Sequence, residues 1–143
     1  MTGDLRLFDT NLLVHAYTVS NERKHDTALS FVEKVWEGEE AATTLQNLCE
    51  FFFVVTRKVS RPIPIAAAET TVKAILASSR WRVIDRTPDT LLKAIELVKV
   101  TRVPFWDALI GVSMLEHGIE TIVTENDRDF KKIRGVTAIN PFK

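Results

Sequence analysis

The chain has 143 residues, 45% of them hydrophobic and 27% charged, and its 19 basic and 19 acidic residues leave no net charge. This composition predicts one globular domain over residues 1–143, in which any nucleic-acid site must come from local clustering of charge. No apolar run reaches the roughly 18 residues of a membrane span and no secretory signal is recognisable, so we expect a cytoplasmic protein with no membrane contact. Cys49 is the only cysteine, which excludes an internal disulfide, fits a reducing compartment and predicts a core position.

Strand-like and helix-like segments alternate from the start of the chain. In the first half we expect, in order, a buried strand over residues 5–8, a helical turn over 12–14, a loop over 20–24, a helix over 25–37 and a strand over 41–44. A helix over 45–59 follows, and its apolar stripe comprises Leu45, Leu48, Cys49, Phe52, Val55 and Val59.

The alternation continues after the breaks at Pro62 and Pro64. The expected elements are a helix over 65–77, a strand over 81–85, a helix from Pro88 to about residue 100, a helix between Pro104 and Gly118, a strand over 121–124, a helical turn within 125–133 and a strand over 136–139. Strands separated by helices predict an α/β fold, namely a three-layer α/β/α sandwich around a parallel sheet of about five strands.

Asp9 ends the first predicted strand. The carboxyl ends of the strands in an open parallel sheet form the crevice where ligands bind, so this acid lies where chemistry is expected. Aspartate is also a favoured N-cap for the helix that would follow. This stretch alone leaves both interpretations open.

Glu50 lies among apolar residues in the helix over 45–59, which predicts a half-buried carboxylate that needs a partner or a metal ion. The alternative is an exposed stripe shared with Gln46, Asn47 and Arg57, on which Glu50 pairs with a nearby base.

Asp107 lies in the first turn after Pro104, where the helix dipole favours an ionised acid. Its apolar neighbours, Phe105 and Trp106 among them, indicate a packed turn; the alternative is a solvated side chain stabilised by the dipole alone. Asp127 and Asp129 follow the strand over 121–124, again at the carboxyl edge of the sheet, although by themselves they would be interpreted as surface charges.

If these acids converge, their mutual repulsion raises their pKa values, and a hard divalent cation with oxygen ligands removes that penalty. Such a site suits hydrolysis of phosphodiester bonds by a metal-activated water. The sequence lacks the motifs of other common catalytic and metal-binding sites. The three histidines lack metal-ligand spacing, and there is neither a glycine-rich phosphate loop nor a Gly-x-Ser-x-Gly elbow.

These motifs make the chain resemble the PIN-domain ribonucleases, and more narrowly the VapC-type toxins of bacterial and archaeal toxin–antitoxin pairs. The matching segments follow the family's order over nearly the whole chain and comprise residues 8–11, 46–51, 55–58, 105–110, 124–130 and 140–142. The resemblance implies an α/β/α sandwich, a Mg²⁺- or Mn²⁺-dependent endoribonuclease activity on RNA, inhibition by a cognate antitoxin protein, and a tendency to form homodimers.

By position, the resemblance implies that Asp9 and Asp107 are the direct metal ligands and that Glu50 is the family's acid on the helix after the second strand. All three are therefore expected to be catalytic.

The sequence departs from the family pattern at the fourth acid. Asn126 stands where many relatives have aspartate, whereas others carry the acid immediately before the phenylalanine, which here is Asp129. We rank Asp129 first and Asp127 second among the catalytic candidates. Asn126 is expected in a supporting role, together with Asn11 and Thr124.

Two basic clusters flank the acids, and either is expected to contact RNA phosphates unless its side chains are simply solvated helix ends. The first cluster is Arg57, Lys58 and Arg61. The second cluster is Arg128, Lys131, Lys132 and Arg134.

Two other functions stay open from the sequence. One is a different phosphoryl-transfer enzyme, such as an aspartyl-phosphate phosphatase or a receiver domain, which needs a nucleophilic Asp and usually a Lys near the phosphate. The other is a non-catalytic PIN-like binding module whose acids are solvated. A stable acyl-phosphate on Asp9 would support the first, and failure to bind Mn²⁺ would support the second.

Overall fold

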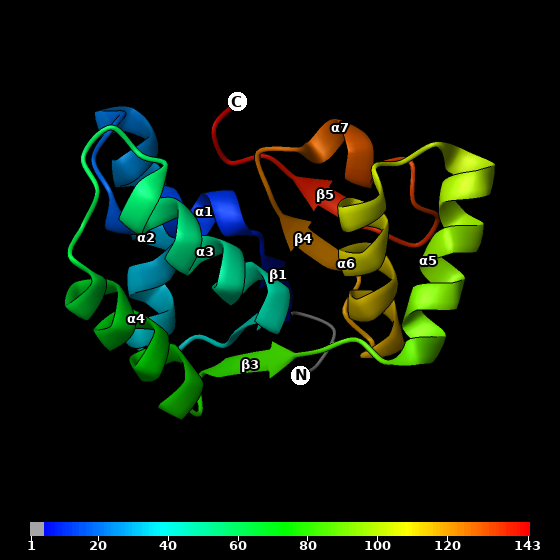
Figure 1. Cartoon of the computed structure of the whole chain (residues 1–143), viewed down its shortest axis with the longest axis horizontal. Coiled ribbons are helices and arrows are strands. Elements are labelled where there is room, and N and C mark those ends of the chain that lie inside the picture. Colours follow the sequence, from blue (N-terminus) through cyan, green and yellow to red (C-terminus); the bar gives the residue numbers. More distant parts are fainter. Residues whose placement is uncertain (1–4) are drawn as a thin grey trace.

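The computed structural model describes residues 5–143, which form a central sheet with helices packed on both of its faces (Figure 1). The strands are β1 (Arg6–Phe8), β2 (Ala41–Thr44), β3 (Trp81–Ile84), β4 (Thr121–Val123) and β5 (Thr137–Ile139). The helices are α1 (Thr10–Tyr17), α2 (Glu22–Trp36), α3 (Leu45–Arg57), α4 (Ile65–Ala77), α5 (Pro88–Thr101), α6 (Phe105–Glu116) and α7 (Asp127–Phe130).

The five strands are all parallel and lie in the order β3-β2-β1-β4-β5. The first strand is therefore central, and its Leu7 lies opposite both Ala42 of β2 and Ile122 of β4. This arrangement confirms the predicted α/β fold with a parallel sheet. None of the helices that residues 5–143 form is long and apolar enough to cross a membrane.

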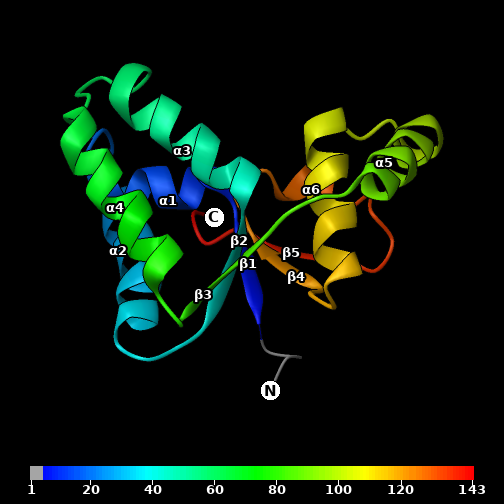
Figure 2. The ribbon, with the colours of Figure 1, turned by 60° about the horizontal axis from the view of Figure 1, so that its bottom comes forward.

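Alternate residues of the strands belong to two separate hydrophobic cores, one on each face of the sheet. Phe8 and Val123 belong to a core covered by helices α1 to α4, whereas Leu7 and Ile122 belong to a core covered by α5, α6 and α7. Figure 2 shows these two groups of helices on opposite sides of the strands. The predicted three layers follow directly from this alternation, because successive strand residues point to opposite faces.

The first two helices are longer than predicted. The expected turn over 12–14 is the middle of the eight-residue α1, and the expected loop over 20–24 contains the start of α2. The reason is a cap: the side chain of Asn21 accepts a hydrogen bond from the backbone N–H of Lys24 and so begins α2 at Glu22.

The prediction that Cys49 lies in the core is wrong, because its side chain is exposed. The residues of α3 that are buried are Asn47, Leu48, Phe51 and Val55. The face toward the core is thus turned away from Cys49, and the predicted stripe is only partly buried.

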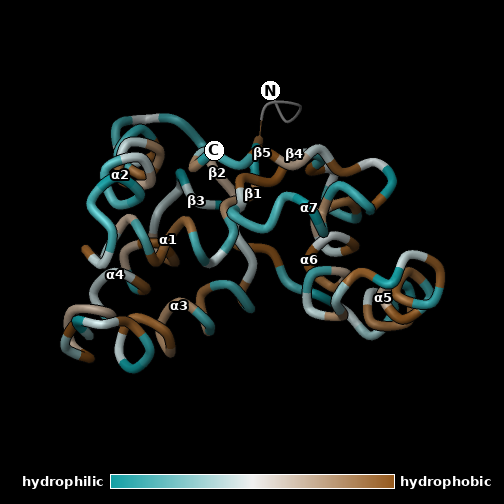
Figure 3. The backbone as a smooth tube through the Cα atoms, turned by 90° about the horizontal axis from the view of Figure 1, so that it is seen from above, coloured by the Kyte–Doolittle hydropathy of each residue, from teal (hydrophilic) through white to brown (hydrophobic). Residues whose placement is uncertain are grey.

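Helix α5 keeps apolar side chains in solvent at one end of the molecule. Leu92 and Val100 are exposed, as are Leu91 and Ile95. Figure 3 shows hydrophobic turns along α5 although no other helix lies outside it.

Candidate active site

Asp9 follows β1 directly, and both interpretations of it hold. Its carboxylate caps α1 by accepting a hydrogen bond from the backbone N–H of Thr10 at 2.9 Å. It also accepts from the Thr124 hydroxyl at 2.7 Å and from the Asn47 amide at 3.1 Å. Burial, with repulsion from Glu50, raises the pKa of Asp9, although these three hydrogen bonds favour its ionised form.

Asp107 lies in the first turn of α6, and its carboxylate accepts a hydrogen bond of 2.6 Å from the side-chain amide of Asn126. Burial, followed by repulsion from Asp9, Asp129 and Glu50, raises the pKa of Asp107 to about 7. Asp9, which follows β1, and the acids of α3, α6 and α7 therefore act on one another, as the sequence led us to expect if they converge.

Glu50 is exposed rather than half-buried, which corrects one expectation. Its carboxylate accepts hydrogen bonds from the Gln46 amide at 2.9 Å and from the Thr10 hydroxyl at 3.4 Å. These bonds hold Glu50 at the rim of the site, over the residue that follows Asp9.

The two acids of α7 point in different directions. Asp127 is buried and faces the C-terminal tail, where it accepts hydrogen bonds from Asn140 and Lys143 and also pairs with Lys131. These hydrogen bonds, that of Asn140 foremost, hold the pKa of Asp127 far below its usual range. Asp129 instead contributes to the repulsion on Asp107, so the structure brings Asp129 and not Asp127 to the other acids.

The three supporting residues predicted from the sequence tie the loop after β4 to the acids. Thr124 binds Asp9 and also accepts from the backbone N–H of Asn126 at 2.9 Å. Asn11 accepts from the backbone N–H of Glu125 at 3.1 Å, and its amide approaches Asp9 at 3.5 Å. The loop is thereby fixed relative to β1.

Sequence reasoning missed two residues of the site. Asn47 is completely buried, donates to Asp9 and Thr10, and forms a capping box with Thr44 at the start of α3. The spacing Thr-x-x-Asn after a strand was the available signal. His15 lines the cavity, and its Nε2 lies 2.8 Å from a Glu125 oxygen; nothing in the sequence singled it out.

Asp9, Glu50 and Asp107, but not Asp129, line a cavity of about 340 Å³ at the carboxyl edge of β1 and β4. The residues that line it are Asp9, Thr10, Asn11, Val14, His15, Gln46, Glu50, Val54, Trp106, Asp107, Ile110 and Asn126.

The donor set of this cavity fits a hard divalent cation. Asp9 and Asp107 both line it, and a bound cation would offset the repulsion between their two negative charges. Within residues 5–143, however, no three His, Cys, Asp or Glu side chains are close enough to hold an ion together. Mg²⁺ is commonly bound in proteins through only one or two carboxylates, a number that Asp9 and Asp107 could supply.

The predicted basic residues lie at two places around the cavity. Arg57 follows Val54 and Glu50 at helical spacing, so it shares the face of α3 that borders the cavity, and Lys58 and Arg61 come just beyond it. In the second cluster Lys131 and Lys132 are paired with the acids of α7, whereas Arg128 is exposed beside Asp129.

A model of the PIN domain family matches residues 6–136. The chain belongs to the PIN domain family. The family predicted from the resemblance is thus confirmed, and the family contains nucleases that use divalent metal ions. A search of curated proteins found no match.

Several solved structures share this PIN fold. A toxin–antitoxin complex from Klebsiella pneumoniae is 24% identical over 95% of this chain and 97% of its own, with a TM-score of 0.66. VapC20 of Mycobacterium tuberculosis, described as a sarcin-ricin loop cleaving toxin, is 23% identical over 83% of this chain and 87% of its own, with a TM-score of 0.62. VapBC2 from Rickettsia felis, bound to a fragment of its promoter DNA, is 19% identical over 95% of this chain and 98% of its own, with a TM-score of 0.66.

Proposed function

We propose that residues 1–143 act as one nuclease domain, the toxin of a toxin–antitoxin pair, and that it hydrolyses RNA in the cytoplasm with Mg²⁺ or Mn²⁺. The observation that carries this proposal is that Asp9, Glu50 and Asp107 line one cavity, where burial and then repulsion among the acids raise the pKa of Asp107 to about 7. Membership of the PIN family and the toxins among its structural neighbours support it.

In the proposed reaction Asp9 and Asp107 hold the cation. The bound cation would lower the pKa of a water ligand and neutralise charge on the phosphate. Hydrogen bonds from Thr124 and Asn47 keep the Asp9 carboxylate in one orientation, and Asn126 does the same for Asp107. Glu50 and Asp129, around the two ligands, would orient water and accept its proton.

The proposed partners are a cognate antitoxin and a second copy of the chain. An apolar groove of about 490 Å³ between α3 and α4, lined in part by Leu48, Phe52 and Leu76, offers a surface for the antitoxin. The exposed leucines of α5 offer a surface for a homodimer. Several structural neighbours are toxin–antitoxin complexes, which supports the first partner.

The phosphatase and receiver alternatives have less support. That chemistry usually needs a lysine near the phosphate, and among the described residues no lysine lines the cavity at Asp9.

The test is cleavage of a panel of RNAs by the purified protein with Mg²⁺, with Mn²⁺ and with chelator. We expect cleavage only with metal, and a loss in Asp9→Asn and Asp107→Asn that exceeds the roughly 10–100-fold typical of residues that only support a ligand. Asp26→Asn, an exposed acid on α2, is the matched control and should cleave normally. Cleavage that survives chelator, or near-normal activity of either site variant, would overturn the proposal.

A further inference from the structure

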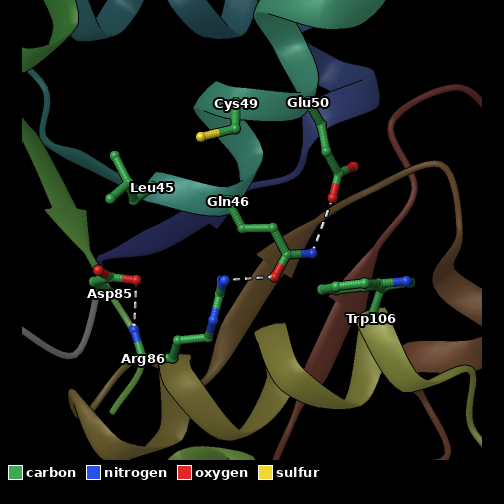
Figure 4. Close-up of a pocket in the computed structure, with 7 residues that line it drawn as sticks. All are labelled: Leu45, Gln46, Cys49, Glu50, Asp85, Arg86 and Trp106. Carbon is green, nitrogen blue, oxygen red and sulfur yellow. Dashed lines mark hydrogen bonds between the residues drawn. The ribbon is translucent and has the colours of Figure 1, made fainter.

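A second cavity of about 650 Å³ adjoins the acidic one. The two share Gln46, Glu50 and Trp106, and the second extends from these residues toward Asp85 and Arg86, which follow β3 (Figure 4). Whatever occupies the second cavity therefore lies directly beside the acids.

Trp106 forms one wall of this cavity although 58% of the residue is exposed. It stands next to Asp107 in the first turn of α6, and its ring meets Phe105 edge-on with centroids 5.1 Å apart. An indole that is largely exposed to solvent beside a set of acids presents a flat surface for stacking.

The opposite wall carries polar groups in a chain. Arg86 donates from Nη1 to Oε1 of Gln46 at 3.5 Å, and Gln46 donates from Nε2 to Oε1 of Glu50 at 2.9 Å. No carboxylate of residues 5–143 lies within ion-pair distance of the Arg86 guanidinium. Figure 4 shows this chain running between α3 and the start of the segment after β3, with Trp106 facing it.

The charge of the cavity favours a neutral occupant over a phosphate. Two carboxylates, Asp85 and Glu50, line it against the single cation of Arg86, so a phosphate group would be repelled. A nucleobase is flat, uncharged and edged with donors and acceptors, which matches one aromatic wall and one polar wall.

We propose that this cavity binds an unpaired nucleobase of the RNA, one nucleotide away from the bond that is cleaved. The base stacks on Trp106, and Gln46 and Arg86 contact its edge. The inference rests on the proposed function, because the acids define which bond is cleaved. It requires a single-stranded or looped substrate, since a base paired in a duplex cannot enter.

The test uses a single-stranded RNA that the protein cleaves at one site, and copies with an abasic nucleotide on either side of that site. Stacking of one base is worth enough to change kcat/KM about tenfold. For one of the two abasic copies, we expect kcat/KM to be about tenfold lower than for the intact RNA, both with the unmodified protein and with Trp106→Phe. With Trp106→Leu we expect the abasic and intact RNAs to be cleaved with the same kcat/KM. Trp36→Phe, in which another exposed tryptophan is changed on α2, is the control and should behave as the unmodified protein.

Binding measured without catalysis separates this inference from the proposed function. A fully 2′-O-methylated copy of the RNA, in chelator, should bind Trp106→Leu and Arg86→Ala more weakly than Trp36→Phe. If the protein cleaves RNA but the abasic penalty persists in Trp106→Leu, the base site is wrong and the nuclease stands. If the protein never cleaves but Trp106→Leu and Arg86→Ala both bind RNA more weakly than Trp36→Phe, the base site stands and the nuclease is wrong. If Trp106→Leu changes neither the abasic penalty nor the binding of the methylated RNA, the base site is wrong and the cavity binds something else, such as a partner protein.

Discussion

Asp9 caps a helix and also faces the cavity, and these roles do not compete. The cap uses Oδ1, to which Thr10 donates, while Oδ2 accepts from Thr124 more than a hundred residues later. Local sequence could predict the first bond because caps follow short-range rules. It could not predict the donor from Asn47, whose polar side chain looked equally suited to the exposed stripe. Only the sheet brings that residue to Asp9.

The raised pKa of Asp107 predicts an unusual pH dependence of stability in the metal-free protein. Because the folded pKa of about 7 lies above the unfolded value near 3.8, folding binds a proton between these limits, and stability falls as pH rises toward 7. Asp107→Asn removes this dependence. Thermal unfolding in chelator should give the variant a melting temperature that exceeds that of the unmodified protein by a few degrees at pH 8, with a smaller difference at pH 5. A difference that does not change with pH would contradict the raised pKa of Asp107.

The opposite orientations of the acids in α7 predict opposite phenotypes. Asp129→Ala should lower Mn²⁺ affinity and cleavage rate about 10–100-fold with little loss of stability, since this acid lies near Asp107. Asp127→Ala should leave Mn²⁺ affinity near normal but release the C-terminal tail, because Asn140 and Lys143 lose their acceptor. Calorimetry with Mn²⁺ and carboxypeptidase digestion of the tail measure the two effects. A complete loss of Mn²⁺ binding in Asp127→Ala alone would reverse the ranking.

At the scale of elements, α3 shows why an apolar stripe does not identify the partner that covers it. Leu45, Cys49 and Phe52 do share a face, but that face borders the groove toward α4 and not the core. The side chains that α3 buries in the core shared with α1, α2 and α4 are Leu48, Phe51 and Val55. Because α3 has apolar residues on both sides, helical spacing predicted its existence and could not predict its rotation.

The cap of α3 links the stability of one helix to the geometry of the site. Asn47→Ala removes a capping side chain, which costs about 1 kcal/mol, and it also removes a donor to Asp9. We therefore expect a lower free energy of unfolding in urea and a weaker affinity for Mn²⁺. Thr90→Ala is a matched control, because Thr90 occupies the same position of a capping box in α5. It should lose comparable stability and bind Mn²⁺ normally. Equal affinity of the two variants for Mn²⁺ would show that Asn47 serves only the helix.

At the scale of the whole molecule, the sequence predicted the layers and the parallel sheet but not the order of the strands. Alternation of strands and helices follows from local patterns, whereas the central place of β1 depends on pairing with Ala42 and Ile122, which are distant in the chain. The same distance explains why the acids could be named individually from the sequence while their convergence needed the structure.

The position of basic residues around the molecule predicts how RNA binding depends on salt. Arg57 continues the face of α3 that borders the cavity, so combined replacement of Arg57, Lys58 and Arg61 by Ala should leave RNA phosphates without their cations. For single-stranded RNA, the slope of log affinity against log salt becomes shallower by about 0.7 for each phosphate that is no longer neutralised. Lys99→Ala with Arg102→Ala, at the far end of α5, is the control. Binding of a non-cleavable RNA at several salt concentrations tests this prediction. An unchanged slope in the triple variant would show that the RNA phosphates contact other residues.

The late arrival of β4 matters while the protein is being made. A ribosome releases Asp9 and Glu50 early, but β1 gains its second neighbour only when Thr121–Val123 has been synthesised, and Thr124 and Asn126 follow still later. Until then the growing chain holds the acids without the threonine and asparagine that orient them. For the proposed nuclease we therefore expect no cleavage of RNA by a chain that stops before β4.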